Sequence, residues 1–205
     1  MHFVCSVFLL ALKFMEFFNF KTRVRPGTGK LLVSEPLLPD PNFERSIILL
    51  CAHDKDGSFG FVLNKPSETR VCEVLDDFEA EELMAFVGGP VAQDTLHYLH
   101  VFEDLEGAQE VLPGIYWGGD FDSLRELARK GECNAGSIKF FLGYSGWSSG
   151  QLNSELKENA WIVSNKVDEE LIFSTDPAVA WRKSMNILGG RFNLYANYPT
   201  DPRLN

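Results

Sequence analysis

The distribution of apolar residues along the chain predicts a series of short strands. Residues 46–53 (SIILLCAH) form a continuous apolar run, which is typical of a strand buried on both faces. The turn sequence DKDGS follows, and residues 59–65 (FGFVLNK) are expected to return as a second strand, so this is the clearest hairpin in the chain. Further strands are expected at residues 29–35, 84–90, 94–102, 114–119, 138–142 and 160–165.

Apolar residues at helical spacing predict helices between these strands. Residues 120–132 carry the clearest signals, because an aspartate opens the segment and Gly131 can end it. Residues 176–190 begin with an aspartate cap and place Pro177 at the first helical position. Two shorter helices are expected at residues 69–78 and 151–156. The mixture of hairpins and isolated helices indicates an α+β fold and not a parallel βαβ array.

No repeat or linker interrupts residues 29–205, so we predict a single domain preceded by an N-terminal arm at residues 15–28. The first eighteen residues are strongly apolar, but they lack the leading basic residue and the cleavage site of a signal peptide. Their apolar core is also shorter than the roughly 20 residues that span a bilayer. We predict that Met15 is the native start and that residues 1–14 are an extension foreign to the protein. A membrane anchor and an ordered apolar arm are the alternatives.

The charge and the cysteines narrow the class of protein. The formal net charge is −10, whereas non-specific nucleic-acid binding needs Lys and Arg to neutralise phosphates. The four cysteines are scattered without a C-x-x-C pair, which fits reduced thiols better than a disulfide framework or a zinc site. We therefore expect a cytoplasmic protein that does not act on membranes, and we expect direct nucleic-acid binding to be absent unless a local basic patch supplies it.

Residues 146–152 (GWSSGQL) match the G-x-S-x-G pattern of a hydrolase nucleophile elbow centred on Ser148. In α/β-hydrolases the histidine follows the serine, but all four histidines of this chain precede Ser148. A convergent triad remains open, because triads are defined by geometry and not by chain order. The glycines favour a tight turn over residues 143–150 whose serines cap the next helix, and an anion-binding loop is the third interpretation. We expect no catalytic residue here.

Three other fragments evoke metal or phosphate sites without completing them. His97 and His100 lie in a predicted strand, where a spacing of three sends side chains to opposite faces. Residues 54–57 (DKDG) resemble the start of an EF-hand loop, but its twelfth position holds Lys65 where glutamate is needed. Residues 25–32 (RPGTGKLL) complete neither the P-loop nor the dinucleotide fingerprint. No metal or cofactor is expected.

Several blocks together resemble the YqgE/AlgH family. They occur in the family's order and make the resemblance extend over residues 29–205. The blocks are residues 29–66, 87–91 (VGGPV), 96–100 (LHYLH), 140–156 (FFLGYSGWSSGQLNSEL) and 201–205 (DPRLN). The family pattern G-Y-x-G-W-x-x-G-Q-L leaves the position of Ser148 free, which argues further against a catalytic serine.

The resemblance implies a single α+β domain from a bacterial cytosolic protein. Its mixed β-sheet is expected to be curled toward a pseudo-barrel, with helices packed on the outside. The family is biochemically uncharacterised, although some members are described as transcriptional regulators on genetic grounds.

From the residues and the resemblance we predict a non-enzymatic binding or regulatory protein that acts through protein or small-ligand contacts. A DNA-associated regulator and a hydrolase that uses Ser148 are the alternatives. The expected binding surface combines the glycine-rich loop, the Gly-Gly-Pro turn and the end of the hairpin, and Trp147 either contacts the partner or clamps the loop onto the sheet. Its residues are Asn64, Gly88, Gly89, Gly143, Tyr144, Gly146, Trp147, Gly150 and Gln151.

Overall fold

The computed structural model describes residues 24–80 and 82–199. The extension expected at residues 1–14, the start at Met15, most of the arm at 15–28 and the terminal block at 201–205 lie outside the described residues.

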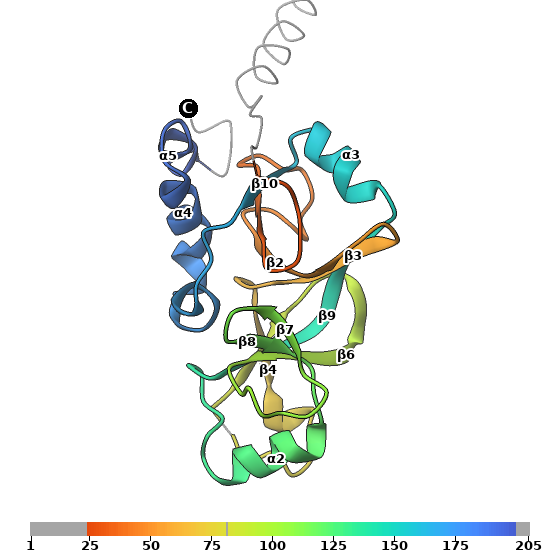
Figure 1. The fold of residues 1–205 in the computed structure, drawn as a ribbon. Coiled ribbons are helices and arrows are strands. Elements are labelled where there is room, and N and C mark those ends of the chain that lie inside the picture. Colours follow the sequence, from red (N-terminus) through yellow and green to blue (C-terminus); the bar gives the residue numbers. More distant parts are fainter. Residues whose placement is uncertain (1–23, 81, 200–205) are drawn as a thin grey trace, which may run out of the picture.

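The described chain consists of ten strands and six helical segments (Figure 1). The strands are β1 (Leu31–Ser34), β2 (Ile47–His53), β3 (Gly57–Val62), β4 (Pro66–Arg70), β5 (Met84–Val87), β6 (Val91–His100), β7 (Gln109–Leu112), β8 (Ile115–Trp117), β9 (Ile138–Ser148) and β10 (Trp161–Ser164). The helices are the 3-10 helix η1 (Val71–Glu73), α2 (Phe121–Arg129), α3 (Gln151–Lys157), the π-helix η2 (Glu170–Ser174), α4 (Pro177–Leu188) and α5 (Phe192–Tyr195).

All ten strands belong to one mixed sheet with the order β10-β1-β2-β3-β9-β6-β8-β7, to which β5 is joined through β9 and β4 through β5. β5 is parallel to β9, and the other pairings are antiparallel. In the described chain, β10 and β7 are the two ends of the path and do not pair with each other, so the sheet is not closed into a barrel. The predicted α+β class with a mixed sheet is confirmed.

Strand β9 holds the two parts of the sheet together. It is eleven residues long, and its second half pairs with β3 while its first half pairs with β5 and β6. Leu142 pairs with Val87 on β5 and also with Leu96 on β6. Because a strand has only two edges, β5 and β6 flank β9 on opposite sides. Residues 88–90, which connect them, therefore carry the chain across one face of β9.

Two glycines allow this crossing. A Cβ atom on Gly88 would lie 2.3 Å from the carbonyl oxygen of Gly143, and one on Gly89 would lie 2.3 Å from the carbonyl carbon of Tyr144. Such contacts are too short for any side chain, so only glycine lets the two backbones approach this closely. The hydroxyl of Ser145 donates to the carbonyl oxygen of Gly88 at 3.0 Å, which fastens the crossing segment to β9.

Helices cover the sheet in three places (Figure 1). α4 buries Trp181 and Met185 in the same hydrophobic cluster as Leu31 and Phe141 of the sheet. α3 contributes Leu152 to a second cluster, which contains side chains of β2, β3 and β10. α2 contributes Leu124 and Ala128 to a third cluster around the start of β9. The expected arrangement of helices on the outside of the sheet is confirmed.

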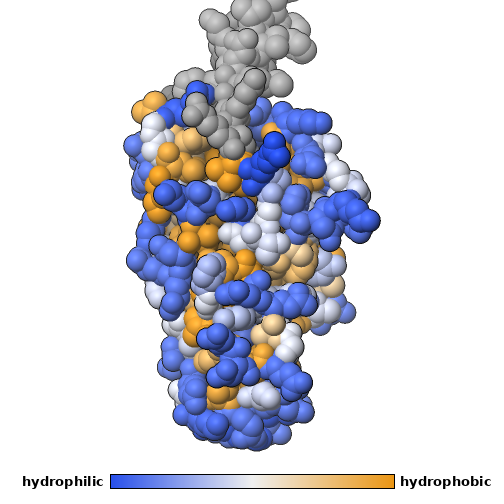
Figure 2. Space-filling model, viewed as in Figure 1, coloured by the Kyte–Doolittle hydropathy of each residue, from blue (hydrophilic) through white to orange (hydrophobic). Residues whose placement is uncertain are grey.

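The face of the molecule shown in Figure 2 is mainly polar. Blue, hydrophilic side chains cover most of the face in Figure 2, and apolar atoms emerge between them along the middle of the molecule. No helix in the described ranges is both long enough and apolar enough to cross a membrane.

Two sequence-based predictions of local structure are wrong. The helix expected at residues 69–78 is only the single turn of η1, which ends at Glu73, and Asp77 further on has a left-handed φ of 59°. The turn expected at residues 143–150 is mostly strand, because β9 continues to Ser148 before the chain turns into α3. Gly143 does not mark a turn there, because it accommodates the crossing segment of residues 88–90.

Candidate functional site

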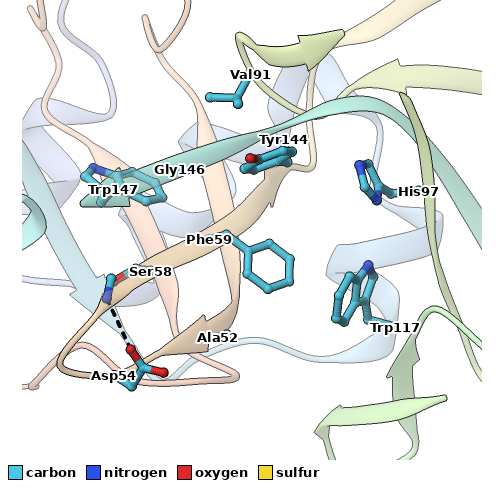
Figure 3. Close-up of a pocket in the computed structure, with 11 residues that line it drawn as sticks. Ala52, Asp54, Ser58, Phe59, Val91, His97, Trp117, Tyr144, Gly146 and Trp147 are labelled. Carbon is cyan, nitrogen blue, oxygen red and sulfur yellow. Dashed lines mark hydrogen bonds between the residues drawn. The ribbon is translucent and has the colours of Figure 1, made fainter. Parts of the chain in front are cut away.

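A groove of about 620 Å³ opens over the central strands of the sheet. Four ring side chains form its walls, and each comes from a different strand (Figure 3). They are Phe59 of β3, His97 of β6, Trp117 of β8 and Tyr144 of β9. We call this site the aromatic groove.

The four rings contact one another edge to face. The ring centroids of Phe59 and Trp117 are 4.7 Å apart with an interplanar angle of 62°. Those of Phe59 and Tyr144 are 6.1 Å apart at 83°, and those of His97 and Tyr144 are 5.8 Å apart at 87°. These separations lie in the favourable range for aromatic pairs, so the walls support one another without a ligand.

Gly143 determines which side chains of β9 reach this face of the sheet. Its φ of 64° is left-handed and interrupts the two-residue alternation of the strand. Phe141 and Tyr144 therefore pack in one hydrophobic cluster although they are three residues apart. Trp147 borders the aromatic groove, but its ring packs in the hydrophobic cluster on the other face of the sheet.

The groove contains one carboxylate among its lining residues and neither Lys nor Arg. Asp54 Oδ1 accepts the backbone N–H groups of Asp56 and Gly57 at 2.8 and 3.1 Å, which holds the carboxylate in the hairpin turn. Burial lowers the pKa of His97 below its ordinary value, so its ring is uncharged at neutral pH. The site is therefore apolar with a single negative charge at its rim.

The groove has an indole and a hydroxyl donor that are uncommitted. In the described chain, the indole N–H of Trp117 and the hydroxyl of Tyr144 make no hydrogen bond. The other three indoles each donate one: Trp147 and Trp161 donate to Glu155 Oε2, and Trp181 donates to the carbonyl oxygen of Ser34. The free donors of Trp117 and Tyr144 are thus available to a ligand.

The residues of the predicted binding surface fall into three groups. Gly88, Gly89, Gly143 and Tyr144 come together at the crossing of β9. Tyr144, Gly146 and Trp147 border the aromatic groove. Asn64, Gly150 and Gln151 are absent from the lining of the groove.

Asn64 lies two residues after the end of β3 and holds the loop before β2 in place. Its side-chain oxygen accepts the N–H of Ile47 at 2.9 Å, and its side-chain nitrogen donates to the carbonyl oxygen of Arg45 at 2.9 Å. Gly150 adopts a left-handed conformation with a φ of 75° at the start of α3. Asn64 therefore fixes a loop and Gly150 allows the turn into α3.

A carboxylate joins the end of β9 to α3 and β10. Glu155 Oε2 accepts the indole N–H of Trp147 at 2.8 Å and that of Trp161 at 2.7 Å. Glu155 Oε1 accepts the side-chain amide of Gln151 at 3.0 Å. Trp147 is only 6% exposed, so this network gives it the geometry of a clamp.

Ser148 and the two strand histidines make no catalytic or metal constellation in the described residues. The hydroxyl of Ser148 donates to Gln151 Oε1 at 3.1 Å and makes no hydrogen bond with a histidine. His97 and His100 do lie on opposite faces of β6, where His100 is stacked between Phe102 and Tyr116. No group of three potential ligands that could hold a metal ion occurs within the described ranges.

Sequence reasoning missed Phe59, His97, Trp117 and Asp54 as members of one site. Each had a local explanation as a strand or turn residue, and they are separated by up to 63 positions, from Asp54 to Trp117. The one signal in the sequence that could have indicated a binding site is the aromatic side chain of Trp117 at the end of a short strand.

Comparison with known proteins supports the same fold. A family model described as AlgH-like matches residues 31–193, which is most of the chain. The chain belongs to the AlgH-like family. A UPF0301 protein of Chlorobaculum tepidum is 42% identical to this AlgH-like chain, over 86% of the chain and 95% of that protein. A UPF0301 protein of Cytophaga hutchinsonii is also 42% identical, over 86% of the chain and 98% of that protein.

Two solved structures resemble this AlgH-like chain. The AlgH protein of Pseudomonas aeruginosa has a TM-score of 0.69 and 26% identity, and the match covers 88% of this chain and 98% of that one. Protein DIP2367 of Corynebacterium diphtheriae has a TM-score of 0.73 at 21% identity, with 88% and 97% covered, which indicates a shared fold.

Proposed function

We propose that this AlgH-like protein is a non-enzymatic binding protein and that a small ligand occupies the aromatic groove. The groove itself carries the proposal. Its volume of about 620 Å³ lies within the range of roughly 300–1,000 Å³ typical of small-molecule sites. Such sites combine mainly apolar walls with a few polar groups, as the four rings, the carboxylate of Asp54 and the free donors of Trp117 and Tyr144 do here.

The chemistry of the lining supports binding over catalysis. A nucleophile needs a base within hydrogen-bond reach and a third group that orients the base. Within the described chain Ser148 contacts only Gln151 through its hydroxyl, and Asp54 is held by its own turn. A regulatory role would follow if ligand binding changed the surface that a partner recognises.

We place this binding in the cytoplasm, where thiols stay reduced. The three cysteines in the described chain, Cys51, Cys72 and Cys133, are free thiols, which supports that compartment.

The proposal can be tested by NMR with a library of small fragments. Trp117 is the reporter, because its indole N–H is the one of the four that makes no hydrogen bond in the described chain. Fragments should shift this indole signal together with the amides of Phe59 and Tyr144. The Trp117→Ala variant should lose these ligands, whereas Leu194→Ala, at a residue 65% exposed on α5, should keep them. Fragments that bind elsewhere and leave the Trp117 signal unmoved would overturn the proposal.

A further inference from the structure

The walls and the rim of the aromatic groove together specify a class of ligand. We propose that the groove selects small organic cations whose ammonium group carries alkyl substituents. This inference rests on the proposed function, because it names the ligand of the same groove.

The ring faces supply the first part of the argument. An aromatic ring is electron-rich on its face, and it attracts a cation that lies within about 6 Å of the ring centroid. The planes of Phe59, Trp117 and Tyr144 are inclined to one another by 62° and 83°, so ring faces point in several directions around the groove. A rounded alkylammonium group can contact several such faces at once, whereas a flat ligand can stack on only one.

The charges supply the second part. Asp54 is the one carboxylate of the lining, and neither Lys nor Arg lines the groove to repel a cation. His97 is kept uncharged by burial and does not oppose a cation either. The whole chain carries a formal net charge of −10, which raises the local concentration of cations and disfavours anions such as phosphates.

The number of polar groups indicates which cation fits. A primary ammonium group has three N–H donors that need acceptors. The groove offers few acceptors beside its rings, and one of the two oxygens of Asp54, Oδ1, already accepts two backbone N–H groups. An alkylated ammonium group has few or no donors to satisfy, so it loses less on leaving water. The volume of about 620 Å³ is that of a small-molecule site and favours a free cation over a peptide.

The test compares choline with its neutral isostere 3,3-dimethyl-1-butanol on the full-length protein. The two probes share a shape and differ in charge. Both should shift the Trp117 indole signal, and choline should bind about 2- to 30-fold more tightly, as cation–π contacts of this kind provide. Equal affinities would overturn the selection for cations while leaving the groove a ligand site.

Two variants separate the rings from the carboxylate. Asp54→Asn retains the oxygen that accepts the N–H groups of Asp56 and Gly57, and it should weaken choline binding about 2- to 5-fold without changing the affinity for the neutral probe. Glu68→Gln removes the same charge from an exposed position on β4 and should change neither affinity. Trp117→Leu retains apolar volume without the ring face, and it should reduce the preference for choline. If Asp54→Asn and Glu68→Gln weakened choline binding to the same extent, the role of Asp54 would be overturned.

Two further outcomes are distinguishable. If a trimethyl-lysine peptide bound more than tenfold more tightly than choline, the proposal of a free cation as ligand would be overturned in favour of a protein partner. If choline leaves Trp117 unshifted while neutral fragments bind the groove, the inference fails and the proposed function stands. If no probe of either kind binds there, both fail.

Discussion

Lys139 places an amine inside the protein, on β9. It is 6% exposed, its Nζ donates to the carbonyl oxygen of Ile172 at 2.9 Å, and it lies 3.9 Å from the centroid of the Phe86 ring. Burial lowers its pKa from 10.5 to about 7. The unfolded chain therefore binds a proton at Lys139 throughout the range from about pH 10.5 to 7, whereas the folded chain does not, and stability falls as the pH falls through this window.

Replacing Lys139 with methionine should flatten this pH dependence. The depressed pKa corresponds to a penalty on the order of 4 kcal/mol at pH 7, and the carbonyl left without its donor costs about 1–3 kcal/mol. Lys139→Met should therefore stabilise the protein by about 1–3 kcal/mol at pH 7 and by less at pH 9.5. Urea unfolding at both pH values measures the difference. The exposed Lys130→Met serves as control, and a variant with the wild-type pH slope would contradict the argument.

Glu155 is the second residue whose removal has a calculable consequence. Glu155→Ala removes one acceptor from the indoles of both Trp147 and Trp161, so the free energy of unfolding should fall by about 2–4 kcal/mol. The indole proton signals of these two tryptophans should move upfield, while that of Trp181 stays in place. Glu158→Ala, at an exposed position just after α3, should have a small effect. An unshifted pair of indole signals would show that the hydrogen bonds are absent in solution.

At the scale of elements, the crossing of β9 depends on the absence of a side chain at Gly88. Gly88→Ala would force a Cβ atom to within 2.3 Å of the Gly143 carbonyl oxygen and should destabilise the protein by about 3 kcal/mol or more. Gly114→Ala is the matched control, because its Cβ would meet no atom within 4 Å and only its φ of 78° is unfavourable. That variant should lose about 1 kcal/mol. Chemical denaturation compares the two, and equal losses would disprove the steric account.

The same elements show which parts of the fold could be predicted from the sequence. The hairpin of β2 and β3 was predicted correctly, because its apolar runs and its turn are adjacent in the chain. The path of β9 could not be predicted, since a glycine in such a sequence usually marks a turn. Only the crossing segment, which is distant in the sequence, explains why a glycine is needed at position 143. The helix expected at residues 69–78 was wrong because apolar spacing alone does not show that the helix ends after one turn, at Glu73.

The candidate site divides in the same way. Tyr144, Gly146 and Trp147 were singled out because they belong to one local glycine-rich block, and all three border the aromatic groove. Phe59 and Trp117 come from distant strands. Their proximity depends on strand pairing, which a single sequence does not specify.

At the scale of the molecule, β9 is common to all parts of the sheet. β3, β5 and β6 all pair with it. Removal of β9 from the sheet would therefore expose an edge of each of these three strands. We therefore expect one cooperative unfolding transition. Tryptophan fluorescence, far-UV circular dichroism and amide hydrogen exchange in β2 and β6 should report the same free energy. Two separate transitions would show that the parts fold independently.

The position of β9 also determines the order in which the protein can be completed during synthesis. The three strands that flank it are made first, and two of them are already tied together by residues 88–90 when β9 leaves the ribosome. β9 must then insert between β5 and β6, with residues 88–90 crossing one of its faces. Until Ser148 has emerged, the nascent chain carries unpaired strand edges of the kind that recruit other chains. We therefore expect the growing polypeptide to be most prone to association with other chains until β9 has paired with its neighbours.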